Sequence, residues 1–219
     1  MKPKIGQDYS RYGLYFKPKA GSALAEFEDK WFAANRPNEI IGIPKRYGLH
    51  ATLKAPFKLD EQHSFDELFA AIKQLSVDFS PIYVGALAQR KIESFLALVP
   101  KSNCPDLDQL AFDCVRMIDP YRAPIEAREL ERRRAVSLNL EEEKMLAQWG
   151  YPYVKDSFRF HITLTGNLHE KQVENIQPEL DDLLKPVLSE PLIIEDICLV
   201  GDPGEGKPFR LLERFSLTK

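Results

Sequence analysis

Polar and hydrophobic positions along the chain follow strand and helix periods in turn. Residues 11–16 alternate bulky β-forming side chains, which predicts a first strand. From Ser22, apolar residues recur at helical spacing as far as Phe32, which predicts an amphipathic helix. Ser64 followed by Glu67 forms a capping box that opens another helix. By the same criteria we predict helices at 64–77, 106–118, 141–149 and 169–184.

The other periodic segments are short, rich in β-forming residues and bounded by turn residues. They predict strands at 46–57, 82–87, 94–99, 158–165, 192–200 and 209–217. We expect the second and third of these to pair through a turn at 89–91. The last two form a closing hairpin around 201–204. The charged stretch 126–134 predicts a solvated helix face rather than a ligand site.

One four-residue pattern, His-x-Thr-Leu, occurs twice. It is found at His50-Ala51-Thr52-Leu53 and again at His161-Ile162-Thr163-Leu164. The chain has only four histidines and four threonines, so two such matches are improbable from ordinary residue usage. The repetition indicates a symmetric site in which each half of the chain supplies one histidine and one hydroxyl.

Each copy of the pattern lies on a predicted strand that is followed by a helix and then by further strands. This order indicates a divergent internal duplication. No low-complexity linker separates the two halves, so we expect a single unit spanning 1–219. The predicted fold class is α+β, with two lobes around a cleft.

Side chains on a strand alternate between its two faces. In the first motif strand, Arg46, Gly48, His50, Thr52 and Lys54 are expected to share one face. In the second, the shared face carries Arg159, His161, Thr163 and Thr165. Both opposite faces are apolar, so each strand presents one face for packing and one for chemistry.

These residue types suit the in-line displacement of a phosphodiester. One imidazole can remove a proton from the attacking water while the other protonates the leaving alkoxide. The hydroxyls of Thr52 and Thr163 can hydrogen-bond the non-bridging oxygens, where negative charge collects. Lys54, Arg159 and Arg46 can supply counter-charge, and Thr165 is a further candidate for substrate binding. The scheme requires no metal ion, and no acidic cluster with ligand spacing lies beside either motif.

The composition of the chain limits the kinds of partner that we expect it to bind. The net charge is −3 and the pI about 5.9, which argues against coating nucleic acid by bulk electrostatics but permits a small anionic substrate. The three cysteines form no Cys-x-x-Cys pattern and are expected to be reduced. The N-terminus lacks a signal-peptide core and no apolar run has membrane-spanning length, so we expect a cytoplasmic protein without membrane contact.

The paired motifs resemble those of the 2H phosphoesterase superfamily, which includes RNA 2′-5′ ligase-like proteins and cyclic nucleotide phosphodiesterases. The resemblance implies two pseudo-symmetric lobes, each with an antiparallel sheet and helices, around a central cleft. It also implies that His50, Thr52, His161 and Thr163 are catalytic. The longer phrases at 46–57, 149–153 and 158–166 are similar to a branch encoded among genes for phosphonate breakdown by carbon–phosphorus lyase.

The resemblance therefore implies a metal-independent phosphodiesterase without a cofactor that acts on a cyclic phosphate of a sugar or nucleotide. An RNA end with a 2′,3′-cyclic phosphate is the rival substrate, which the acidic pI disfavours because RNA binding usually needs a basic track. Two alternatives of another class are a non-catalytic module that binds a nucleotide or sugar phosphate, and a scaffold protein. Which histidine is acid and which is base stays open, as do the reaction direction and the oligomeric state.

Overall fold

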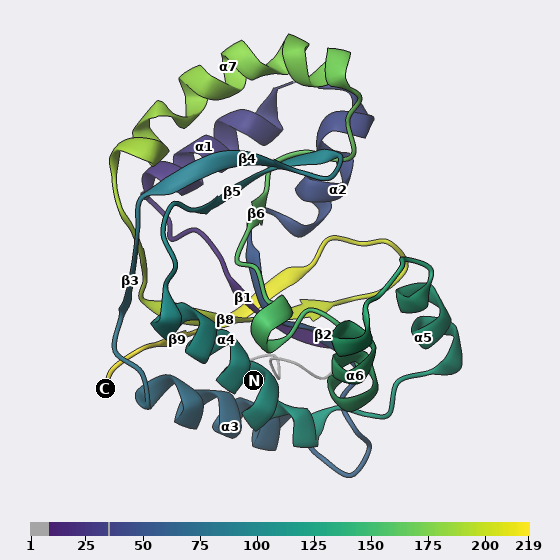
Figure 1. Ribbon diagram of the computed structural model, residues 1–219. Coiled ribbons are helices and arrows are strands. Elements are labelled where there is room, and N and C mark those ends of the chain that lie inside the picture. Colours follow the sequence, from purple (N-terminus) through teal and green to yellow (C-terminus); the bar gives the residue numbers. More distant parts are fainter. Residues whose placement is uncertain (1–8, 35) are drawn as a thin grey trace.

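The computed structural model describes residues 9–34 and 36–219 (Figure 1). Its helices are α1 (Ala23–Ala33), α2 (Asn38–Tyr47), α3 (Phe65–Val77), α4 (Pro105–Ile118), α5 (Ala127–Arg134), α6 (Leu140–Trp149) and α7 (Glu170–Ser189). Its strands are β1 (Arg11–Phe16), β2 (Ala51–Phe57), β3 (Ile82–Gly85), β4 (Leu87–Ile92), β5 (Phe95–Pro100), β6 (Ile162–Thr163), β7 (Leu192–Ile194), β8 (Asp196–Asp202) and β9 (Arg210–Ser216). Short 3-10 helices lie at Asp119–Tyr121 and Lys155–Ser157.

The strands form separate antiparallel sheets. One has the order β2-β1-β8-β9, another the order β4-β5-β6, and the pair β3-β7 lies between them (Figure 1). Helices α3 and α4 cover the four-stranded sheet, and α1 and α7 lie together over the three-stranded sheet. The α+β fold with two lobes predicted from the sequence is confirmed.

Each lobe is assembled from both halves of the chain. The first motif leads into β2 in the four-stranded sheet, and the second lies on β6 in the three-stranded sheet. The N-terminal helix α1 nevertheless packs in the lobe of the second motif, where the Nε1 of the fully buried Trp31 donates to the carbonyl of Leu164 at 2.8 Å. A duplication that gives each half its own compact lobe does not describe this arrangement.

Helix starts agree with the cap residues seen in the sequence. Ser22 caps α1 through its side chain, and Ser64 and Glu67 form a reciprocal capping box at α3. Asn139 forms a second capping box with Glu142 at α6. Side-chain caps satisfy backbone N–H groups that have no partner within a helix, so these starts are fixed locally.

Several predicted strands differ from the structure. Residues 46–57 do not form one strand, because α2 continues to Tyr47 and β2 begins only at Ala51. The break is at Gly48, whose φ of +67° ends the helix. Of the segment 158–165, only Ile162–Thr163 pairs in a sheet.

The predicted pairing of 82–87 with 94–99 is wrong. Gly85, at a φ of +84°, divides the first segment, so that β3 pairs with β7 and β4 pairs with β5. The segment 192–200 is also divided, at Glu195, into β7 and β8. The closing hairpin of β8 and β9 is confirmed. Helix α7 runs past its predicted end to Ser189.

Candidate active site

The loop between α2 and β2 places His50 at the edge of the four-stranded sheet. Gly48 adopts a φ of +67°, a conformation that L side chains rarely adopt. A Cβ there would meet Glu28 Oε1 at 2.8 Å and Lys17 Nζ at 2.9 Å. The glycine therefore allows both the sharp turn and the close approach of two charged side chains. His50 Nδ1 donates to the Gly48 carbonyl at 2.8 Å.

Lys17 and Glu28 hold the backbone on either side of Gly48. Lys17 Nζ donates to the carbonyls of Tyr47 at 3.0 Å and Leu49 at 3.4 Å. Glu28 Oε1 accepts a hydrogen bond from the Leu49 amide at 2.8 Å. These bonds fix the loop and leave the Gly48 carbonyl for the histidine ring. The sequence gives no signal for either residue, because neither lies near the motif in the chain.

Aromatic rings surround the His50 imidazole. It stacks on Tyr15 with ring centroids 4.3 Å apart, and Tyr47 lies at 5.7 Å. Burial lowers the pKa of His50 to about 4, an effect that the hydrogen bond to Gly48 opposes and that the charges of Lys17 and His161 reinforce. At neutral pH the ring is therefore uncharged. Because Nδ1 carries the hydrogen that is donated to the carbonyl, Nε2 has a free lone pair.

The second motif repeats this local geometry. His161 Nδ1 donates to the carbonyl of Arg159 at 2.8 Å, again two residues before the histidine. The ring lies 5.9 Å from that of Phe95 on β5, and β5 pairs with β6 beside it. Both motif histidines are therefore held in the tautomer that leaves Nε2 available.

Contacts between neighbouring residues bring the two motifs together. Phe16 pairs with Ala51 across β1 and β2, and its ring lies 6.0 Å from that of Phe160. Ala51 and Phe160 are the immediate neighbours of His50 and His161. The charge of His161 also contributes to the lowered pKa of His50. The two imidazoles, from different sheets, are thus within electrostatic reach of each other.

The two motif threonines lie beside their histidines and are partly exposed. Thr52 pairs with Tyr15, the residue on which His50 stacks, and Thr163 pairs with Ala97. Within the described part of the chain, neither hydroxyl takes part in a hydrogen bond, so both are available to a ligand.

Two predicted substrate-binding residues are instead engaged with the protein. Lys54 pairs with Leu14 while Thr52 pairs with Tyr15, so β2 contains a bulge that breaks the expected alternation. Lys54 is buried, and its Nζ donates to the Val115 carbonyl at 3.3 Å and to Asp119 at 3.2 Å. Its pKa is lowered to about 8, because burial outweighs the attraction of Asp119.

Thr165 is also buried, with 1% of its surface exposed. Its Oγ1 accepts from the Leu96 amide at 2.9 Å and donates to the Gly166 carbonyl at 2.9 Å. The hydroxyl therefore completes the hydrogen bonding of an irregular strand end. Like Lys54, Thr165 makes its contacts within the protein, and a role for either in substrate binding stays a prediction.

The two arginines have different surroundings. Arg46 lies in the last turn of α2 rather than on a strand; its Nε donates to the Lys207 carbonyl at 3.3 Å and its guanidinium lies 5.4 Å from the Tyr47 ring. Its predicted place on the strand face of His50 is therefore wrong. Arg159 is exposed, and its side chain forms no ion pair with any described residue. A role for either in substrate binding stays a prediction.

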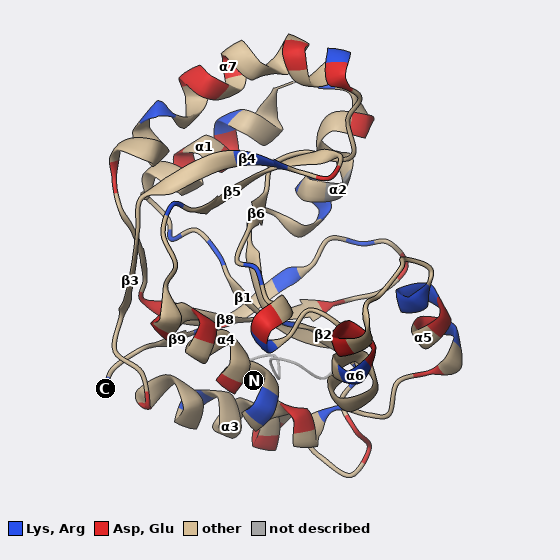
Figure 2. Ribbon diagram, viewed as in Figure 1, with Lys and Arg blue, Asp and Glu red and all other residues tan. Residues whose placement is uncertain are grey.

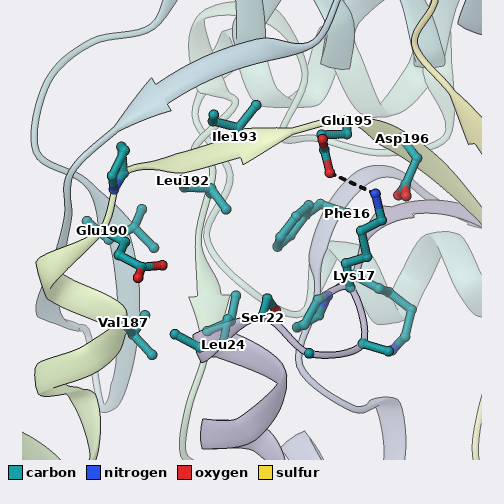
Figure 3. A pocket seen from close by; sticks show the side chains of 17 residues that line it. Phe16, Lys17, Ser22, Leu24, Val187, Glu190, Leu192, Ile193, Glu195 and Asp196 are labelled. Atoms are coloured by element: carbon teal, nitrogen blue, oxygen red, sulfur yellow. Dashed lines mark hydrogen bonds and ion pairs between the residues drawn. The ribbon is translucent and has the colours of Figure 1, made fainter.

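Lys17 also lines a cavity of about 370 Å³ between the start of α1 and the connection from α7 to β7 (Figure 3). Leu24 and Val187 contribute apolar surface, and Lys19 and Glu195 form an ion pair at 2.9 Å. Neither motif histidine lines this cavity, so we do not assign the reaction to it.

No group of three or more His, Cys, Asp or Glu side chains among the described residues is arranged to hold a metal ion. None of the described helices combines the length and the apolar character needed to span a bilayer.

The two motifs, which resemble those of the 2H phosphoesterase superfamily, thus share one local geometry. Residues 52–210 match the model of a family described as "Protein of unknown function (DUF1045)", and the chain belongs to this family.

Two curated relatives carry the name ribose 1,5-bisphosphate phosphokinase PhnN. The protein from Janthinobacterium sp. (strain Marseille) is 30% identical over 225 residues, and that from Laribacter hongkongensis (strain HLHK9) is 29% identical over 216 residues. The alignments cover 93% and 92% of this chain but 50% of each relative. The chain thus spans about half the length of the curated relatives it matches.

Solved structures with a similar arrangement share little sequence with the chain. E. coli LigT complexed with NADP+ is 16% identical with a TM-score of 0.46, covering 97% of this chain and 100% of that one. A protein described as a phosphoesterase is 17% identical with a TM-score of 0.47, covering 96% and 99%. Kluyveromyces marxianus Usb1 with uridine monophosphate is 11% identical with a TM-score of 0.35, covering 94% and 98%. Because these TM-scores are below 0.5, the functional proposal rests on the motifs and their geometry.

Proposed function

We propose that this chain is a phosphodiesterase that opens a cyclic phosphodiester of a sugar or nucleotide. The observation that carries the proposal is the matched geometry of the two motif histidines. Each donates from Nδ1 to the carbonyl two residues earlier, and each therefore keeps Nε2 free for proton transfer.

We assign the two rings different roles in the reaction. His50 has its pKa lowered to about 4, so it is uncharged at neutral pH and is suited to act as general base. His161 is then the general acid. Its hydrogen bond to the Arg159 carbonyl is compatible with the protonated ring, because an imidazolium still carries a hydrogen on Nδ1.

In the proposed reaction, His50 Nε2 removes a proton from water as the water oxygen attacks phosphorus. The bond from phosphorus to the leaving oxygen breaks on the opposite side, and His161 transfers its Nε2 proton to that oxygen. The product is a phosphate monoester with a free hydroxyl, and the protons on the two rings exchange with solvent. The hydroxyls of Thr52 and Thr163 donate to the non-bridging oxygens, where charge develops. The scheme needs no metal ion.

The substrate that best fits the relatives is a cyclic phosphate of ribose. The name of the two curated relatives specifies ribose 1,5-bisphosphate as the compound on which they act. In a cyclic diester that joins O1 and a neighbouring oxygen of 5-phosphoribose, attack of water that breaks the bond from phosphorus to that neighbouring oxygen leaves the phosphate on C1, and the product is that compound. This connection, together with the similarity of the motif phrases to a branch encoded with phosphonate-degradation genes, supports a role in phosphonate metabolism.

The test is a product-detecting assay on ribose cyclic phosphates and 2′,3′-cyclic nucleotides. His50→Ala and His161→Ala should each lower kcat/KM by at least about 10²-fold, the ordinary contribution of a general acid or base. The matched controls are His63→Ala and His169→Ala, the other two histidines of the chain, which should retain wild-type rates.

Two results would contradict the proposal. One is a wild-type rate in both motif variants. The other is the absence of turnover by the wild-type chain together with saturable binding of a cyclic phosphate, which would indicate a non-catalytic binding module.

A further inference from the structure

A groove of about 1000 Å³ begins beside the residues that precede His161. It is lined by the β4–β5 hairpin, by the segment that leads from β5 into α4, and by residues 155–160 before the second motif. The groove is therefore bounded by the sheet of one lobe and by the α4 helix of the other (Figure 1). Neither the motifs nor the proposed mechanism uses most of this surface.

Positive charge is concentrated in this groove. Its basic residues lie on β4, after β5 and in the segment before β6, where Figure 2 shows blue ribbon. They are Arg90, Lys91, Lys101, Lys155 and Arg159. Two carboxylates, Asp108 and Asp156, also line the groove. The lining thus has a clear excess of cations in a chain whose net charge is −3.

None of these five cations forms an ion pair within the described part of the chain. Some arginines elsewhere are paired: Arg122 contacts Asp119 at 2.8 Å, and Arg214 contacts Asp196 at 3.0 Å. Like charges gathered without partners repel one another, so they destabilise the folded chain unless an anion joins them. The arrangement is typical of a surface that binds a negatively charged ligand.

The groove also offers aromatic surface near its cations. Phe112 and Phe158 line it, and Lys155 Nζ lies 4.8 Å from the centre of the Phe112 ring. Such a surface suits a ligand that combines a ring with phosphate groups, because the ring can lie against the aromatic side chains while the cations hold the phosphates.

The residues that lead into the second motif line the groove, although neither motif histidine does. Arg159 lines the groove, and its carbonyl accepts the hydrogen bond from His161 Nδ1. Phe160 also lines the groove, and its ring lies 6.0 Å from Phe16, which pairs with the residue after His50. The groove thus lies beside the segment that immediately precedes His161.

We propose that this groove binds the non-reacting phosphate of a substrate that carries one phosphate in a cyclic diester and another as a monoester. The inference rests on the proposed function and specifies its substrate class as a doubly phosphorylated small molecule. The volume is at the upper end of the range for small-molecule sites. Arg159 and Lys155 are the nearest cations along the chain to His161, and the other three increase the local concentration of anionic substrate.

Calorimetric binding of ribose 5-phosphate tests the groove without requiring turnover, with unphosphorylated ribose as the reference ligand. The double variant Lys155→Gln/Arg159→Gln should weaken binding of ribose 5-phosphate at least about tenfold, because charge-assisted hydrogen bonds to the phosphate are lost. The matched control is Arg128→Gln/Lys171→Gln. It removes two exposed cations that also lack ion pairs within the described chain but lie outside the groove, and it should bind like the wild type.

Several outcomes would overturn the assignment of the groove. These are equal binding by wild type and the groove variant, no phosphate-dependent binding by the wild type at millimolar concentrations, or an equal loss in the control variant. A single-stranded RNA oligonucleotide that binds more tightly than ribose 5-phosphate, and loses affinity in the groove variant, would replace the small-molecule assignment by an RNA one.

The binding assay also separates this inference from the proposed function. His50→Ala and His161→Ala should still bind ribose 5-phosphate through the groove. If they do, and the wild type hydrolyses no cyclic phosphate, the groove assignment stands while the phosphodiesterase proposal fails. If cyclic phosphates are hydrolysed but a 5-phosphate gives no advantage in kcat/KM over the same substrate without it, the groove assignment fails alone.

Discussion

Lys17 and His50 are linked through the backbone of one loop. Lys17 Nζ donates to the carbonyls of the residues that flank Gly48, and His50 Nδ1 donates to the carbonyl of Gly48 itself. The same lysine acts on the histidine through space, since its charge contributes to the lowered pKa of His50. One buried cation on β1's C-terminal side therefore both positions the ring and favours its uncharged form.

Replacing Lys17 by Met should weaken catalysis and shift its pH dependence. The charge of Lys17 lowers the pKa of His50, so its removal raises that pKa toward the ordinary value. The acid limb of the kcat/KM profile should then move to higher pH, because the base becomes protonated sooner. We also expect up to about a 10²-fold loss of kcat, since a small displacement of a catalytic group is costly. An NMR titration of the His50 ring measures the shift independently of turnover.

The matched control is Lys19→Met. Lys19 lies two residues after Lys17, but its partner is Glu195 rather than the carbonyls that flank Gly48. This variant should leave the His50 titration and kcat unchanged. An unaltered titration of His50 in Lys17→Met would contradict the electrostatic link.

Gly48→Ala should destabilise the fold and impair catalysis. The substitution places a Cβ at a φ of +67° and within 3.0 Å of both Glu28 and Lys17. Strained backbone of this kind costs about 1–3 kcal/mol, and displacement of either charged side chain adds to that cost. Gly206→Ala is the control, because Gly206 has a φ of +73° but no atoms near its Cβ position. Chemical denaturation should show the larger loss for Gly48→Ala, and an equal loss would indicate backbone strain alone.

The pKa of His50 also predicts how stability depends on pH. An unfolded histidine titrates near 6.5 and the folded one near 4, so between these values the unfolded chain binds more protons. The contribution of His50 to the unfolding free energy is fully present above pH 6.5. It is lost as the pH falls toward 4, by up to about 1.4 kcal/mol per pH unit. His50→Phe keeps a ring beside Tyr15 and removes the titration. The difference in unfolding free energy between wild type and His50→Phe should therefore fall over this range, whereas a constant difference would contradict the lowered pKa.

Local signals in the sequence located most of the elements. The caps at Ser22, Ser64 and Asn139 begin the helices at the predicted positions, because a cap acts through bonds to residues close in the chain. Pairing between strands depends on distant partners, and this is where prediction failed: β3 pairs with β7, which no local pattern indicates.

The residues of the candidate site likewise fall into those that local sequence signals indicated and those that depend on distant partners. The repeated motif singled out both histidines, and strand alternation placed Thr52 beside His50. Alternation failed for Lys54, because a bulge in β2 turns its side chain toward Asp119. Lys17 and Glu28 could not be found from the sequence, since their roles depend on backbone atoms of a loop that is distant in the chain.

The same substitution at two neighbouring threonines should give opposite results. Thr163→Val removes a hydroxyl that has no hydrogen bond within the described chain, so folding should be little affected. If this hydroxyl stabilises the non-bridging oxygens, kcat should fall by roughly 10²-fold. Thr165→Val instead removes the acceptor of the buried Leu96 amide, which should cost about 1–3 kcal/mol of stability with kcat and KM close to those of wild type. Thermal unfolding and steady-state kinetics on both variants separate the two roles, and a stable but inactive Thr165→Val would place Thr165 in the substrate site.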